Sequence, residues 1–124
     1  LLYVADRIKN RVQCFERRPG GAGVVREGMI APGPAAYGSA FDLAFSPCGG
    51  FMYVSDGSNN RVWIVSMASF EVMGWTGSYC AAEGSGNMPA LRQLIHRFTL
   101  DPAGNIGLVR PASGVQVLRF EGVW

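Results

Sequence analysis

An Asp…Asn-Arg pattern occurs twice in this sequence, and its residue types could do chemistry. In each copy an Arg stands five positions after an Asp and directly after an Asn. A carboxylate at a strand end accepts hydrogen bonds from turn amides, and a guanidinium can pair with that carboxylate. The pattern therefore predicts either a binding site or a structural clamp on a turn. The residues concerned are Asp6, Asn10, Arg11, Asp56, Asn60 and Arg61.

The recurrence of this pattern favours the clamp. Repeat proteins reuse the same structural parts from one unit to the next, whereas a ligand site is built once. We therefore interpret the six residues as a repeated turn clamp and not as a binding site.

His96 is the one histidine of the chain and the one candidate metal ligand. A catalytic zinc site needs about three protein ligands, which a single histidine does not provide. The sequence also lacks the short motifs of serine hydrolases, zinc proteases, nucleotide-binding loops and calcium loops. We therefore predict no catalytic residues, no metal site and no cofactor.

Binding residues are expected in two long loops, because loops carry the binding function of most repeat folds. One loop spans 32–39 and has Tyr37 near its centre, and the other spans 74–89 and is rich in glycine. An exposed indole at the end of the strand before the second loop would add a ligand-binding surface to that loop. The binding candidates are Tyr37, Trp75, Tyr79, Glu83 and Asn87.

Three cysteines, Cys14, Cys48 and Cys80, occur without a Cys-x-x-Cys motif. This spacing argues against a structural zinc site, and the odd number leaves at least one thiol without an internal partner. Their redox state and the cellular compartment stay open.

The elements that position these residues repeat as well. "YVADRIKNRVQCF" (3–15) matches "YVSDGSNNRVWIV" (53–65) at a spacing of 50 residues. Each copy has an apolar run, a polar turn and a second apolar run, which predicts a β-hairpin. The strands expected here are 3–5, 12–15, 52–55 and 62–65.

The segments before the hairpins repeat too. "FDLAFSPCGG" (41–50) matches "HRFTLDPAGN" (96–105), and each ends in a Ser/Asp-Pro-x-Gly turn signal. A third, degenerate hairpin follows at 106–120. The pattern predicts an all-β chain of ten strands in four-stranded β-propeller blades. We expect an incomplete blade at 1–40, a complete blade at 41–95 and an incomplete, degenerate blade at 96–124.

The quoted hairpins resemble the NHL repeat, a blade unit of β-propellers, especially those of bacterial origin. The first hairpin is also similar to peptidyl-hydroxyglycine amidating lyase. The NHL resemblance implies blades of about a six-bladed ring and a non-enzymatic binding module of unknown ligand. The alternatives that it implies are a metal-dependent lyase or hydrolase holding zinc or calcium, with His96 as a ligand, and an RNA-binding propeller.

The composition narrows the expected partners. The net charge of +2 is low for a nucleic-acid binding domain, and no apolar run reaches about 18 residues, the length of a membrane span. Two and a half blades leave an apolar blade face open to water at each of the two flanks. We therefore expect either a longer natural chain or self-association, such as a homodimer that completes a ring.

Overall fold

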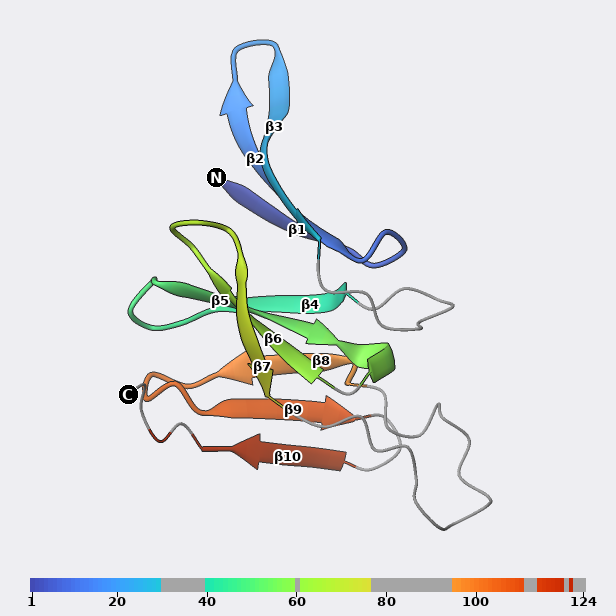
Figure 1. Cartoon of the computed structure of the whole chain (residues 1–124), viewed down its shortest axis with the longest axis vertical. Helices are drawn as coiled ribbons and strands as arrows, with labels where there is room; N and C mark the ends of the chain where they lie inside the picture. Colours follow the sequence, from blue (N-terminus) through green and yellow to red (C-terminus); the bar gives the residue numbers. More distant parts are fainter. Residues whose placement is uncertain (30–39, 60, 77–94, 111–113, 120, 122–124) are drawn as a thin grey trace.

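The computed structural model describes residues 1–29, 40–59, 61–76, 95–110, 114–119 and 121. Within these residues the chain forms ten strands in three antiparallel sheets, and the expectation of an all-β chain is confirmed. Figure 1 shows the sheets following one another along the long axis of the molecule. No helix among the described residues is long and apolar enough to cross a membrane.

The sheets follow the chain order. Sheet 1 consists of β1 (Leu2–Asp6), β2 (Arg11–Arg18) and β3 (Gly21–Met29). Sheet 2 consists of β4 (Ala40–Phe45), β5 (Phe51–Asp56), β6 (Arg61–Ser66) and β7 (Val72–Thr76), with a short 3-10 turn, η1 (Gly57–Asn59), between β5 and β6. Sheet 3 consists of β8 (Arg97–Leu100), β9 (Ile106–Arg110) and β10 (Gly114–Leu118).

The two central strands of sheet 2, β5 and β6, are buried on both faces, which explains why each reads as a continuous apolar run. Successive side chains of a strand point to opposite faces. In β5, Met52 and Val54 pack into the core shared with sheet 1, and Tyr53 packs into the core shared with sheet 3. In β6, Trp63 faces sheet 1 and Val62 faces sheet 3.

The two Pro-x-Gly turns form as their sequences indicate. The amide of Gly49 donates to the carbonyl of Ser46 at 2.9 Å, and the amide of Gly104 donates to the carbonyl of Asp101 at 2.9 Å. Both glycines have a positive φ, 72° and 85°, a conformation that residues with a Cβ rarely adopt. These turns join β4 to β5 and β8 to β9, so they fix the strands that carry the site described below.

Sheet 1 is longer than the sequence indicated. β2 continues through Arg18, and β3 begins at Gly21 after a turn in which Gly20 and Gly21 have positive φ. The resulting hairpin of β2 and β3 projects beyond the other two sheets (Figure 1).

Candidate functional site

The strands that lie nearest to each other in adjacent sheets are β1, β4 and β8, because β4 contacts both of the others. β1 ends where β4 and β8 begin. We call this side of the three sheets the turn end, since the β1–β2 and β5–β6 turns also lie there. Residues that are far apart in the sequence meet at the turn end.

Three of these residues form what we call the inner row: Arg7, Phe41 and His96. The Cζ atom of Arg7 lies 4.2 Å from the centroid of the Phe41 ring. The His96 ring lies 5.7 Å from the Phe41 ring, centroid to centroid. Arg7 and His96 are exposed, whereas Phe41 is half-buried between them. The row therefore presents a cation and an imidazole on either side of an aromatic ring.

A β-bulge positions the central ring of this row. The register of β4 against β5 shifts between Ala40 and Asp42, so Phe41 has no direct partner on β5. Such a bulge re-aims a side chain at the end of a strand. The ring lies against Gly57, where an added Cβ would be 2.7 Å from Phe41. The bulge and the glycine together bring the ring between Arg7 and His96.

Polar contacts hold β4 and β8 together below the row. The carboxylate of Asp42 accepts hydrogen bonds from the amide of Leu43 at 3.0 Å and from the amide of Phe98 at 3.3 Å. The amide of His96 donates to the carbonyl of Val109 at 3.1 Å. Asp42 thus ties the start of β4 to β8, and the backbone of His96 is fixed.

The inner row can bind an anion and move a proton. A guanidinium offers planar, paired N–H donors to a carboxylate or a phosphate. An imidazole can accept or donate a proton near neutral pH. Both groups are open to solvent here, and the phenyl ring between them offers an apolar surface to a small molecule.

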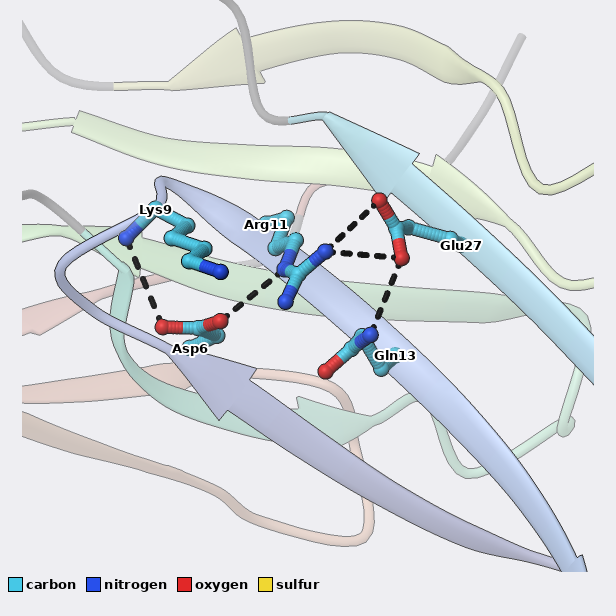
Figure 2. A network of polar contacts seen from close by, with 5 residues as sticks. All are labelled: Asp6, Lys9, Arg11, Gln13 and Glu27. Carbon is cyan, nitrogen blue, oxygen red and sulfur yellow. Dashed lines mark hydrogen bonds and ion pairs between the residues drawn. The ribbon is translucent and has the colours of Figure 1, made fainter. Parts of the chain in front are cut away.

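The first predicted clamp forms an ion-pair network on sheet 1 (Figure 2). The Nε atom of Arg11 donates to Asp6 at 2.9 Å, and its Nη1 atom donates to both oxygens of Glu27 at 2.9 Å. The side-chain amide of Gln13 also donates to Glu27 at 2.9 Å, and the amide of Lys9 donates to Asp6 at 3.4 Å. Arg11 therefore joins the β1–β2 turn to β3.

The second predicted clamp differs from the first. The buried carboxylate of Asp56 accepts hydrogen bonds from the side-chain amide of Asn59 at 2.9 Å and from the Nε1 atom of Trp63 at 2.9 Å. Within the described part of the chain, Arg61 has no ion pair, and its Nε atom is buried without a hydrogen-bond partner. The structure thus brings Asp6 and Arg11 together but gives Asp56 partners other than Arg61.

The sheet 1 network should make stability fall in acid. Hydrogen bonds from Arg11 hold the pKa values of Asp6 and Glu27 below their ordinary values of 3.8 and 4.5. A lowered folded-state pKa stabilises the protein above the ordinary value, and this contribution is lost as the pH falls through the folded value. We expect the unfolding temperature of wild type to fall more steeply between about pH 5 and pH 3 than that of Arg11→Gln. Parallel slopes in thermal melts of the two proteins would contradict this.

Of the predicted binding residues, Trp75 lies in the described part of the chain. Its side chain is 56% exposed at the outer strand of sheet 2, and its ring lies 5.2 Å from that of Trp63 in an edge-to-face arrangement. The other predicted residues that lie outside the described residues are Tyr37, Asn60, Tyr79, Cys80, Glu83 and Asn87.

Two of the three cysteines differ sharply in accessibility. Cys14 is fully buried, whereas Cys48 is exposed, and both are free thiols. A hydrogen bond with Ser46, helped by the backbone of Gly50, lowers the pKa of Cys48 and so increases its thiolate fraction. We expect iodoacetamide to modify Cys48 in the native protein and to leave Cys14 intact until the protein unfolds. Peptide mass spectrometry would detect this order, and equal labelling of both in native protein would refute it.

No group of three or more His, Cys, Asp or Glu side chains converges within the residues that the structure describes. His96 has an aromatic ring and a backbone carbonyl as its neighbours in this part of the chain. Among the described residues, the inner row is therefore not accompanied by a cluster of metal-ligating side chains.

An apolar groove of about 500 Å³ lies between sheets 2 and 3. Its walls include Tyr53, Ile64, Met73, Ile106 and Leu118. Such a lining binds apolar groups but supplies few polar contacts to orient a reacting one. The inner row therefore remains the better candidate for chemistry.

Arg7, Phe41 and Gly57 were missed as site residues by the sequence analysis. One signal was present, because the repeat aligns Phe41 with His96 at the start of equivalent strands. Arg7 and Gly57 also occupy equivalent positions, each directly after its Asp. The alignment could not tell that these four positions meet, since their contact depends on how one sheet packs on the next.

Comparison with known proteins supports the fold. No protein-family model matches the sequence, and no curated protein matches it significantly. The structure is similar to a crystal structure from Bacteroides fragilis NCTC 9343 described as a "putative 6-phosphogluconolactonase". The TM-score is 0.66 at 20% identity, over 93% of this chain and 30% of that chain. This likeness supports a β-propeller-like all-β fold, but it does not show the NHL type of repeat.

The same comparison overturns the predicted non-enzymatic binding module, because the protein that shares the fold is described as an enzyme. The earlier prediction rested on the absence of contiguous catalytic motifs. The absence of such motifs does not exclude a site, because residues from separate parts of the chain can still meet, as Arg7, Phe41 and His96 do.

Proposed function

We propose that this chain is part of a β-propeller hydrolase that opens an anionic sugar lactone at the inner row. The observation that carries the proposal is the meeting of Arg7, Phe41 and His96 from three sheets. The similarity to a structure described as a putative 6-phosphogluconolactonase supports the choice of this substrate class.

Each member of the inner row has a role in this reaction. The imidazole of His96 accepts a proton from water as the water oxygen bonds to the lactone carbonyl carbon. The ring C–O bond then breaks, and the imidazolium returns the proton to the leaving alkoxide, so that water and lactone give one hydroxy acid. Arg7 binds the anionic group of the substrate, and the ring of Phe41 packs against the sugar.

We also propose that the three sheets belong to a larger assembly of blades. The chain spans 30% of the length of the similar structure. The outer faces of sheets 1 and 3 expose apolar side chains, among them Val4 at 39%, Val115 at 72% and Val117 at 64%. We propose that these sheets are NHL-like blades and that further blades cover the two faces, either from a longer chain or from a second copy.

Proton release by the purified protein tests this function. A pH indicator would follow the hydrolysis of 6-phosphogluconolactone, with the spontaneous rate in buffer subtracted. The proposal predicts catalysis of the phosphorylated lactone and slower catalysis of unphosphorylated gluconolactone, which lacks the group that Arg7 would bind. Rates equal to the spontaneous rate with both lactones would overturn it.

A further inference from the structure

Arg61 of sheet 2 has no counterion among the described residues, although it lies at the place where sheet 1 holds an ion pair. The strand registers make the two places equivalent, since Gln13 lies opposite Glu27 in sheet 1 and Trp63 lies opposite Trp75 in sheet 2. Trp63 thus stands where sheet 1 has an amide, and Trp75 stands where sheet 1 has the carboxylate that neutralises its arginine.

The exchange of a carboxylate for an indole changes the surroundings of Arg61. Its Cζ atom lies 5.2 Å from the centroid of the Trp75 ring and 5.6 Å from that of Trp63. Asp56, directly opposite on β5, has its carboxylate occupied by Asn59 and Trp63. No described residue forms an ion pair with Arg61, and its half-buried guanidinium keeps a buried Nε atom without an acceptor.

We propose that Arg61 and Trp75 form a binding site for a small ligand that carries an oxyanion, either a phosphate or a carboxylate. A guanidinium presents its N–H donors in a planar fork that matches these groups in two parallel hydrogen bonds. Both indole rings lie within cation–π distance of the guanidinium, and partial burial strengthens the attraction to an anion. The indole of Trp75, 56% exposed, offers its surface to the rest of the ligand.

The site lies at the turn end, on the outer half of sheet 2. Arg61 begins β6, and Trp75 lies next to the last residue of β7, whereas Phe41 of the inner row is on β4. Neither Arg61 nor Trp75 has a role in the proposed hydrolysis. Failure of either proposal therefore leaves the other standing.

Calorimetric titration of the purified protein tests the site, with sodium phosphate in one series and sodium acetate in another at constant ionic strength set with sodium chloride. Arg61→Gln removes the cation. Trp75→Glu restores the arrangement of sheet 1 and supplies an internal carboxylate to Arg61. The matched control is Arg11→Gln, which removes an arginine that Asp6 and Glu27 already neutralise.

We expect wild type and Arg11→Gln to bind one of the two anions with equal affinity. Arg61→Gln and Trp75→Glu should bind the same anion at least about tenfold more weakly than wild type, as expected for the loss of a charge-assisted hydrogen-bond pair. Tighter binding of phosphate or of acetate identifies the preferred group. Trp75→Glu, at an exposed position, carries the test if Arg61→Gln does not fold. Equal binding by wild type and Trp75→Glu, or no binding of either anion by wild type, would overturn the site.

Discussion

Replacement of Asp56 by alanine is expected to lower the free energy of unfolding by about 3–5 kcal/mol. The carboxylate is buried and accepts hydrogen bonds from the side-chain amide of Asn59 and from the Nε1 atom of Trp63, both at 2.9 Å, and from the amide of Asn59 at 3.2 Å. Its loss removes the acceptor of the buried Trp63 Nε1 atom and the hydrogen bonds that Asn59 makes to it, and a buried donor that loses its acceptor costs about 1–3 kcal/mol.

The matched control is Asp6→Ala at the equivalent position of sheet 1. Asp6 is paired with Arg11, but its side chain is 25% exposed, whereas that of Asp56 is fully buried, and ion pairs that reach solvent contribute little to stability. Chemical denaturation of the two variants should therefore show a much larger loss for Asp56→Ala. Similar losses would mean that the buried network of sheet 2 adds nothing beyond the clamp of sheet 1.

A methyl group at Gly57 is expected to lower the free energy of unfolding by about 2–3 kcal/mol, the usual cost of overpacking a core. An added Cβ would lie 2.5 Å from the carbonyl oxygen of Ile95 and 2.7 Å from the ring of Phe41. The carbonyl belongs to the backbone directly before His96, so relief of the clash must move β8 or the ring. Gly57→Ala should therefore disturb the inner row as well as the fold.

Gly74→Ala in β7 is the control for this substitution, because nothing lies within 4 Å of a Cβ added there. Its stability, measured by denaturant unfolding, should equal or slightly exceed that of wild type, since alanine restricts the unfolded chain more than glycine does. An unchanged stability of Gly57→Ala would contradict the close packing of Phe41 against η1.

The strands of this chain could be predicted because they repeat. Copies such as Tyr3 and Tyr53 mark equivalent strands, and the Pro-x-Gly turns mark where strands reverse. The length of β2 was underestimated, because its apolar alternation is weak and its hairpin with β3 depends on the positive φ of Gly20 and Gly21.

The interactions of the two arginines could not be predicted from their identical spacing to Asp. Arg11 has Glu27 on the neighbouring strand, whereas Arg61 has Trp75 there. The cross-strand neighbour decides the role of the cation, and that neighbour lies more than a dozen residues away in the chain. The division of the chain at 40/41 and 95/96 and its self-association stay predictions.

The inner row could not be predicted from the sequence for a related reason. Arg7 follows β1, Phe41 lies in a bulge of β4 and His96 precedes β8, so no contiguous motif joins them. Their contact arises from the packing of three sheets and from the close approach that Gly57 permits. A search for short catalytic patterns therefore found nothing where the structure brings a cation and an imidazole together.

The rate at which His96→Gln hydrolyses 6-phosphogluconolactone tests whether the inner row is the catalytic site. Glutamine keeps hydrogen-bonding groups at this exposed position but does not accept a proton from water, so we expect the rate to fall about a hundredfold or more relative to wild type. Arg18→Gln is the control, since Arg18 lies far along β2 from the inner row and pairs with Glu16 at the surface. Wild-type rates for both variants, with thermal melts that show both to be folded, would contradict the assignment of the inner row as the catalytic site.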